Sequence, residues 1–535
     1  MNTDFLKIHA KDNVIVALSE ITAGTELQID GAKVVVNETI PQKHKLCIAQ
    51  LEVGEELVMY GVIVAKATSP IKAGDLISTT NVAHQTASSI RKNKTSLWNA
   101  PDISSWKSRH FMGFHRADGQ VGTANNWLFF PLVFCENRNI EILKDTFEKE
   151  LFPQAPNPYR RHLRNLLQKE NSTEEKEENT PHLEHVNLRF ISHQGGCGGT
   201  KEDAVLLARL LAGYVNNPNV AGATVLSLGC QHLQIEVFKE ALESLSSDSK
   251  KPVLIFEQQQ MGTTEQMLTQ VIEQSYNEIQ LANQLKRAPA PLSKLTIGLE
   301  CGGSDGFSGI SANPTLGYVS DVLSALGGSS ILAEFPELCG VEQDLVDRCV
   351  NDEIATKFLT LMHNYDQSAQ NVGSGFDMNP SPGNVKDGLI TDAIKSAGAA
   401  KKGGTSPIVD VLDYTEYVSK NGLNLLCTPG NDVESTTAMV GSGANLVLFT
   451  TGLGTPTGNP ITPVLKIASN SDLCTKMPDI IDFDTGAVIR GEKSIEEMGE
   501  LLLEFIIEVA SGRLTINTDR HKQFDFIPWK RGVSL

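Results

Sequence analysis

Short apolar runs alternate with stretches of helical periodicity over most of this 535-residue chain, and this alternation constrains the fold more than any other feature. Residues 186–191 precede a helical stretch at 202–211, and residues 224–228 precede another at 231–242. Strands that alternate with helices form parallel sheets covered by helices. The sequence therefore predicts an α/β fold for most of the chain.

The N-terminal part follows a different pattern. Up to residue 87 the chain has short β-rich runs separated by glycine-containing turns, which is typical of a small all-β module. Residues 88–108 are polar and lack a sustained apolar period, so we interpret them as a linker. Because the remainder is too long for one ordinary core, we expect two α/β domains with mainly parallel sheets, at 109–288 and 289–535.

Charge and cysteine content narrow the possible partners. The chain has 46 Lys and Arg against 64 Asp and Glu, a net charge of −18, which disfavours binding to nucleic acid and to anionic membranes. Its N-terminus lacks the pattern of a signal peptide, and its nine cysteines form no CxxC pairs. We expect a cytoplasmic homo-oligomer, and the acidic total does not exclude a small anionic substrate.

Cysteines follow several of the predicted strands. Cys197 lies in the glycine loop SHQGGCGGT, which also contains His193, and Cys230 and Cys301 follow two further apolar runs. Cys135 comes after a fourth run. Ligands in parallel α/β sheets bind at the carboxyl ends of the strands, so these thiols are candidate ligands for iron or zinc. The alternative for each cysteine alone is a small packing residue.

Polar, glycine-rich loops of the C-terminal half are candidate sites for a carboxylate. One of them leads towards Asn313, which we expect to cap a helix that begins with Pro314, and helix N-termini attract anions. Two further polar loops contain NPSPGN and TTGLGTPTG. The predicted substrate-binding residues of these loops are Gly302, Gly303, Ser304, Asp305, Asn313, Asn379, Asn384, Thr451 and Thr455.

Several strings together resemble one enzyme family. They are HRADGQVGTANN, SHQGGCGGT, SLGCQ, LECGGSDGFSGISANPTLG, NPSPGN, PGND and FTTGLGTPTG. In this order, and over nearly the whole chain, they resemble the altronate/galactarate dehydratases. The N-terminal module resembles the SAF domain, a β-clip-like fold, with which these enzymes begin.

The resemblance implies a hydro-lyase that removes water from a sugar acid with the help of Fe²⁺ or Mn²⁺. The expected substrate is D-altronate and the expected product 2-dehydro-3-deoxy-D-gluconate. In this interpretation Cys197, Cys230 and Cys301 bind the metal, with Cys135 as an outer candidate. His193 is the expected base that removes the C2 proton.

Other site residues follow from segments that resemble the family. Lys395, Lys402 and Lys466 are candidates for contact with the substrate carboxylate, although any one lysine alone is more commonly solvated. Arg116 and Asp118, in HRADG, are candidate catalytic residues in a loop between domains. Their alternative role is a structural ion pair.

One departure from the family concerns histidines. Altronate enzymes can carry a His-x-His-x-His run where this chain has Leu76, Ser78 and Thr80, so those ligands are absent here. His84 is a possible substitute, and an exposed histidine without a role is the alternative.

Three other functions stay open at this point. The substrate could be galactarate or a sulfonated hydroxy acid, because the family acts on both. The cysteines alone would also fit a metal-binding or iron–sulfur protein without turnover. A carbohydrate-binding or assembly module on an inert scaffold is disfavoured by the many polar glycine loops.

Overall fold

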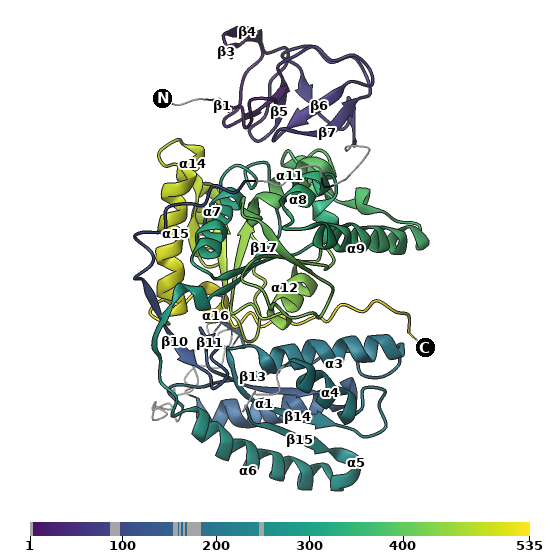
Figure 1. Cartoon of the computed structure of the whole chain (residues 1–535), viewed down its shortest axis with the longest axis vertical. Coiled ribbons are helices and arrows are strands. Elements are labelled where there is room, and N and C mark those ends of the chain that lie inside the picture. The colour runs from purple at the N-terminus through teal and green to yellow at the C-terminus, as the bar shows by residue number, and fades with distance from the viewer. Residues whose placement is uncertain are drawn as a thin grey trace.

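A computed structural model of the chain shows three regions stacked along the long axis (Figure 1). The structure describes residues 4–85, 92, 97–152, 159, 162–163, 166–167, 183–245 and 251–534. These ranges exclude residues 88–91 and 93–96 of the predicted linker. They also exclude most of the charged segment between residues 153 and 182.

The N-terminal region is an antiparallel β module, as predicted. Its largest sheet has the order β1-β2-β5-β8, beside the hairpin β3-β4 and the sheet β6-β7-β9. The strands are β1 (Phe5–Leu6), β2 (Val14–Ala17), β3 (Glu26–Ile29), β4 (Ala32–Val35), β5 (Lys45–Cys47), β6 (Glu56–Met59), β7 (Val62–Ala67), β8 (Leu76–Ile77) and β9 (Val82–Ala83). Alternating burial along β3 and β6 is the pattern of strands with one solvated face.

The second region is built on a parallel four-stranded sheet with the order β13-β12-β14-β15. Its strands are β12 (Asn126–Pro131), β13 (Asn187–Phe190), β14 (Val220–Ser227) and β15 (Val253–Glu257). Its helices are α1 (Asn137–Leu151), α3 (Lys201–Asn216), α4 (Ile235–Leu245), α5 (Gln258–Met261) and α6 (Thr264–Ala282). All six residues of β12 are buried, as expected for a central parallel strand.

The C-terminal region is built on a parallel seven-stranded sheet with the order β19-β20-β18-β17-β21-β22-β23. Its strands are β17 (Thr296–Cys301), β18 (Ser329–Leu332), β19 (Ile408–Leu412), β20 (Gly422–Leu426), β21 (Leu446–Thr451), β22 (Val464–Ala468) and β23 (Phe483–Asp484). Its helices include α7 (Ala312–Ala325), α8 (Glu342–Arg348), α9 (Asp352–Asn371), α10 (Pro382–Lys386), α11 (Asp392–Ala399), α12 (Asp432–Gly441), α13 (Ser471–Lys476), α14 (Gly486–Ile489), α15 (Ile495–Ala510) and α16 (Asn517–Arg520). The fully buried strands β18, β20, β21 and β22, together with β17, of which Thr296 is partly exposed, form the centre of the core.

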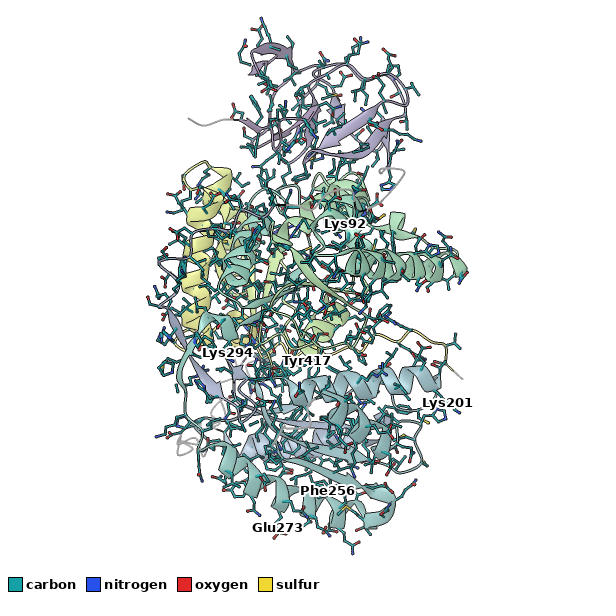
Figure 2. The ribbon with its side chains drawn as sticks, in the orientation of Figure 1. Lys92, Lys201, Phe256, Glu273, Lys294 and Tyr417 are labelled. Atoms are coloured by element: carbon teal, nitrogen blue, oxygen red, sulfur yellow. The ribbon has the colours of Figure 1, made fainter. Side chains whose placement is uncertain are left out.

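A small antiparallel sheet, β11-β10-β16, links the two α/β regions. Its strands are β10 (His110–His115), β11 (Val121–Gly122) and β16 (Ala288–Pro291). Lys294 donates a hydrogen bond to the carbonyl of Gly119 over 3.0 Å, and Tyr417 donates one to Gln120 over 3.3 Å. Figure 2 labels Lys294 and Tyr417 where these regions meet. The C-terminal tail runs between the same regions (Figure 1).

The β module contacts the loops at the carboxyl edge of the seven-stranded sheet. Lys43 forms an ion pair with the buried Asp305, with 2.8 Å between Nζ and Oδ2. Lys45 donates a hydrogen bond to the carbonyl of Gly388, and Thr391 donates one to the carbonyl of Val64. The module is therefore joined to the loops that follow the strands of the C-terminal sheet.

One detail of the sequence interpretation was wrong. Asn313 does not cap α7, because the helix already begins at Ala312 and the N-cap is Ser311. Within the part of the chain that the structure describes, no helix is both long and apolar enough to span a membrane.

Candidate active site

A buried group of ionisable side chains lies at the carboxyl end of β17, next to the end of β18. Cys301 is the last residue of β17, and its Sγ donates a hydrogen bond to Glu337 Oε2 over 3.2 Å. Glu334 follows β18, with its Oε2 3.9 Å from the same Sγ. The three side chains are a possible metal-binding group, because sulfur and carboxylate oxygen are both metal ligands.

Two lysines enter this group from the segment around α11. Lys402 Nζ donates hydrogen bonds to Cys301 Sγ over 2.9 Å and to Glu334 Oε2 over 3.0 Å. Lys395 Nζ is 2.6 Å from Glu337 Oε1 and donates to Asn379 Oδ1 over 2.8 Å. The lysines offset much of the negative charge, which is required when several carboxylates are buried together.

A second, overlapping group contains Glu300, Glu334 and Asp432. Ser435 of α12 donates a hydrogen bond to Glu300 Oε2 over 2.6 Å. The Oε1 atoms of Glu300 and Glu334 have no hydrogen-bond donor among the described residues. A buried carboxylate oxygen needs such a donor, so these two atoms require either a proton shared between the carboxyl groups or a cation.

The protonation of the group follows from burial and neighbouring charges. Burial and the charge of Glu334 raise the pKa of Glu300, while burial and the charge of Glu337 raise the pKa of Glu334 to about 7. Burial opposes ionisation of Glu337 as well, but Lys395 and Lys402 outweigh it and lower its pKa. Burial and Glu337 raise the pKa of Cys301, which is therefore a thiol in this arrangement. The group combines carboxyls that retain protons with a carboxylate that does not.

Lys466, on β22, lies beside this group in an environment that is unusual for a lysine. Its side chain is fully buried, and its Nζ is 3.1 Å from the ring centroid of Phe449. Nζ has no hydrogen-bond partner among the described residues. Burial lowers the pKa of Lys466 to about 7, although Asp432 and Glu300 act in the opposite direction. A lysine with this pKa is able to accept a proton near neutral pH.

The glycine loop after β17 lies against the acidic group. A Cβ at Gly302 would stand 2.0 Å from Asp432 Oδ2, so only glycine allows this approach, and Gly303 has a φ of +61°. Asp305 is fully buried and accepts hydrogen bonds from Ser308 and Ser469. The predicted Gly302, Gly303 and Asp305 thus shape the loop.

The other predicted polar residues hold neighbouring loops in place. Thr450 donates a hydrogen bond to Asn313 over 2.7 Å, and Asn384 donates to the carbonyl of Ser304 over 2.7 Å. Thr451 accepts a hydrogen bond from the backbone N–H of Gly454. Thr455 Oγ1 lies near Gly303, 3.1 Å from where a Cβ of that glycine would stand. Of the predicted polar loop side chains, Asn379 is the one that contacts the ionisable group directly.

His193 does not have the environment of a base. Its Nδ1 accepts a hydrogen bond from the Gly195 N–H, and its Nε2 contacts the carbonyl of Pro131 over 2.7 Å, so both ring nitrogens are occupied. Burial lowers the pKa of His193 to about 4. The histidine holds the glycine loop against the end of β12.

Arg116 and Asp118 are likewise engaged with the protein itself. Arg116 donates hydrogen bonds to the carbonyl of Pro218 and to Asn125, and burial lowers its pKa to about 10. Asp118 accepts two hydrogen bonds from Gln120 within the turn between β10 and β11. Both residues stabilise the hairpin that joins the two α/β regions.

The predicted cysteines do not converge on one site. Cys301 belongs to the seven-stranded sheet, whereas Cys135, Cys197 and Cys230 follow strands of the four-stranded sheet. Among the described residues, no group of three potential metal ligands contains two cysteines. The expectation of convergence failed because strand ends of two different sheets were treated as one edge. Cys135 and Cys230 are exposed, and Cys197 is half-buried.

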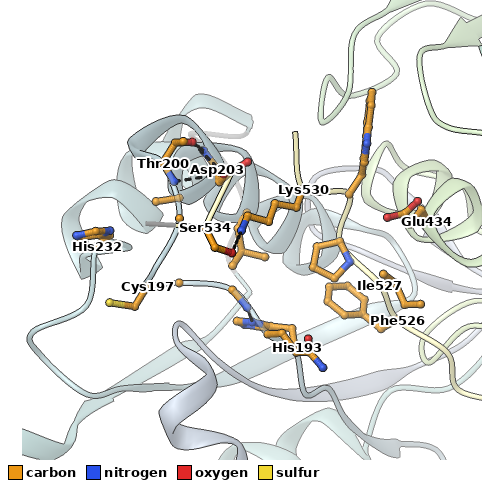
Figure 3. Close-up of a pocket in the computed structure, with 18 of the residues that line it drawn as sticks. His193, Cys197, Thr200, Asp203, His232, Glu434, Phe526, Ile527, Lys530 and Ser534 are labelled. Carbon is orange, nitrogen blue, oxygen red and sulfur yellow. Dashed lines mark hydrogen bonds between the residues drawn. The ribbon is translucent and has the colours of Figure 1, made fainter. Parts of the chain in front are cut away.

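A separate pocket of about 610 Å³ surrounds the SHQGGCGGT loop (Figure 3). It is lined by His193, Cys197, His232 and the C-terminal tail, and Glu434 of α12 lies at its other side. Thr200 caps α3 there through a hydrogen bond from the Asp203 N–H. The pocket contains one potential metal thiol but not the lysine–carboxylate group.

Sequence reasoning missed the acidic members of the site, Glu300, Glu334, Glu337 and Asp432. Two of them had a signal, because Glu300 stands in ECGGSDG and Asp432 in PGND, both strings of the family pattern. Glu334 and Glu337 follow an apolar run without glycine, so nothing separated them from ordinary surface carboxylates.

Comparison with known proteins shows which family the chain resembles over its whole length. Three family models match in order: the altronate/galactarate dehydratase SAF domain over residues 3–85, the second domain of D-galactarate dehydratase/altronate hydrolase over 113–283, and the C-terminal domain of D-galactarate/altronate dehydratase over 292–534. The altronate dehydratase of Escherichia coli strain K12 is 34% identical over 99% of this chain and 100% of its own length. This chain belongs to the altronate/galactarate dehydratase family.

Two other members of the altronate/galactarate dehydratase family are similarly close. The altronate dehydratase of Bacillus subtilis strain 168 is 33% identical, over 99% of both chains. The L-threo-forming galactarate dehydratase of Escherichia coli strain K12 is 30% identical, over 96% of this chain and 94% of its own. All three relatives named here are dehydratases, enzymes that remove water from their substrates.

Proposed function

We propose that this protein dehydrates a sugar acid, with D-altronate as substrate and 2-dehydro-3-deoxy-D-gluconate as product. The observation that carries the proposal is the buried group around Cys301, Glu334 and Lys402 at the carboxyl edge of the main sheet. The reaction removes a proton from C2 and hydroxide from C3, and the resulting enol becomes the 2-keto acid. Groups that exchange protons near neutral pH suit this chemistry.

The residues present fit a divalent metal. Cys301, Glu334 and Glu337 offer sulfur and oxygen, and the Oε1 atom of Glu334 lacks a hydrogen-bond donor among the described residues. We propose that these residues, with Glu300 or Asp432, hold Fe²⁺ or Mn²⁺. When bound, such an ion would stabilise the negative charge that develops on the substrate carboxylate.

The protein's own side chains would bind and orient the substrate and move the proton. Lys395 and Asn379, at the less buried edge of the group, suit contact with the substrate carboxylate and hydroxyls. Lys466 is the candidate base, because its neutral form is accessible at a pKa of about 7. Glu300, whose pKa is raised by burial and by the charge of Glu334, is the candidate proton donor to the departing hydroxyl when Asp432 completes the metal site.

Turnover of a substrate panel tests the proposal. Protein purified without oxygen and loaded with Fe²⁺ is incubated separately with D-altronate, galactarate and a sulfonated hydroxy acid, and 2-keto-3-deoxy acids and released sulfite are measured. The proposal expects the highest kcat/KM with altronate. Galactarate is the second candidate, because the similarity to the galactarate enzyme also extends over nearly the whole chain. Absence of turnover with every member of the panel would contradict a dehydratase function.

A further inference from the structure

A third group of potential metal ligands lies outside the candidate active site, where the β module meets the C-terminal region. It consists of His84, Cys339 and Asp392, whose ligand atoms all lie within 4.8 Å of one another. His84 follows β9 of the module, Cys339 follows the segment that carries Glu337, and Asp392 is the first residue of α11. Three ligand types thus meet from three separate segments.

Asp392 supplies an independent indication of a ligand. Its side chain is 4% exposed, and one carboxylate oxygen, Oδ1, contacts His84 Nδ1. The other oxygen, Oδ2, is buried and has no hydrogen-bond partner among the described residues. A buried carboxylate oxygen without a partner is unfavourable unless a proton or a cation satisfies it.

The surrounding charge favours a cation over a proton alone. Glu342, mostly buried at the start of α8, is close enough that its pKa, raised chiefly by burial, is also affected by both His84 and Asp392. Two carboxyl groups therefore face one imidazole. A divalent ion would neutralise this excess, and nitrogen, sulfur and oxygen ligands together suit a borderline metal such as Zn²⁺ or Fe²⁺.

We propose that His84, Cys339 and Asp392 form a structural site for a borderline divalent metal that fastens the β module to the C-terminal region. The site lies beside the active-site group along the chain: Cys339 is two residues after Glu337, and Asp392 is three residues before Lys395. Occupancy would hold both segments, and with them the Glu337–Lys395 ion pair. The proposal does not rest on the proposed dehydratase activity.

Metal content in a variant that lacks the active-site ligands tests this site. The double variant Cys301→Ala/Glu334→Gln removes a member of each overlapping group in the active site. After chelation, anaerobic reloading with Zn²⁺ and desalting, this protein should retain about one zinc ion per chain. Adding His84→Ala should abolish that zinc, whereas adding His44→Ala, a histidine of the same module whose ring is hydrogen-bonded to the Gln42 carbonyl, should not.

Cobalt identifies the sulfur ligand. Co²⁺ loaded into the double variant should give the sulfur-to-cobalt charge-transfer absorption in the near ultraviolet, and Cys339→Ser should remove it. If the double variant does not fold by circular dichroism, the comparison is made between the native protein and His84→Ala, which should lose about half of its bound zinc. Three outcomes would each overturn the proposed site. They are a zinc content that His84→Ala leaves unchanged, a correctly folded double variant that binds no zinc, and a cobalt spectrum that Cys339→Ser leaves unaltered.

Discussion

Lys402 donates a hydrogen bond to the thiol of Cys301 over 2.9 Å, although the two side chains are only 1% and 3% exposed. The same ammonium group pairs with Glu334. One buried cation therefore serves both a candidate metal thiol and a carboxyl whose pKa lies near neutrality. The two proposed functions of the site, cation binding and proton transfer, therefore both involve this lysine.

Lys402→Met should destabilise the protein by about 3–5 kcal/mol at pH 8, because Glu334 remains buried without its partner. Without Lys402 the pKa of Glu334, already raised to about 7, rises further. The folded state then holds a proton that the unfolded state releases, so stability should fall as the pH rises and the variant should recover part of its loss at pH 6. Urea denaturation at both pH values measures this. Lys401→Met, at the exposed neighbour, should change little.

Cys301→Ser should abolish most bound iron and lower kcat at least about tenfold while the fold is retained, because a hydroxyl is a harder and less readily ionised ligand. The control is Cys349→Ser, another buried cysteine, which donates to the Leu345 carbonyl away from the acidic group. Iron content, kcat and thermal midpoint are measured for both. Full iron content and activity in Cys301→Ser would refute thiol ligation.

Lys466→Met should lower kcat by two or more orders of magnitude, about the contribution of a general base, yet raise stability near pH 7. The folded pKa of about 7 lies below the unfolded value of about 10.4, so between these values the unfolded state binds the extra proton. The native chain should therefore gain stability as the pH rises through this window, and the variant's advantage should shrink.

In the native protein kcat/KM should also rise with pH around 7 as Lys466 loses its proton. Pairing pH–rate profiles with denaturation curves separates the two effects. The exposed Lys476→Met is the control. An unchanged kcat in Lys466→Met would remove this lysine as the base.

Lys43→Met should weaken the attachment of the β module. The ion pair of Lys43 with the fully buried Asp305 would be lost, and Asp305 would keep only its hydrogen bonds to neighbouring groups. We expect a loss of about 3 kcal/mol in stability and a raised KM, because Asp305 belongs to the glycine loop. Lys33→Met, which breaks the exposed ion pair with Glu26, should lower the free energy of unfolding by less than about 0.5 kcal/mol.

His193→Gln should leave the chemistry largely intact and reduce stability by about 1–3 kcal/mol, because a buried hydrogen bond to the Pro131 carbonyl is perturbed. Because the pKa of His193 is lowered to about 4, its protonation should not cause any loss of activity that appears above pH 5 in the pH–rate profile. A loss of kcat of a hundredfold or more, with the fold intact, would restore His193 as a candidate base.

The sequence predicted the architecture well because periodicity and glycine position are local properties. The apolar run at 186–191 contains β13, the helical stretch at 202–211 lies within α3, and the α/β region follows the antiparallel module as expected. The apolar run that precedes Cys301 was correctly placed before a glycine loop. What local pattern does not contain is which strands share a sheet, and this is why Cys197 and Cys230 were grouped with Cys301.

The candidate site was predicted only in part, because local sequence pattern identifies its loops but not which side chains are buried together. Lys395, Lys402 and Lys466 were identified from family strings, and all three lie in or beside the buried group. Glu334 and Glu337 escaped because an acidic residue after a strand is ordinarily solvated, and only the fold reveals that these two are buried. His84 could not be interpreted from sequence, since its neighbours Cys339 and Asp392 are distant along the chain.

Glu334 adopts the left-handed conformation, with φ of +67° and ψ of +63°, which side chains with a Cβ rarely occupy. Glycine at this position would relieve the backbone and at the same time remove the carboxyl group that accepts from Lys402. Directed evolution that selects variants by melting temperature would therefore confuse two opposite effects at residue 334. A library designed for thermal robustness should therefore keep Glu334 constant.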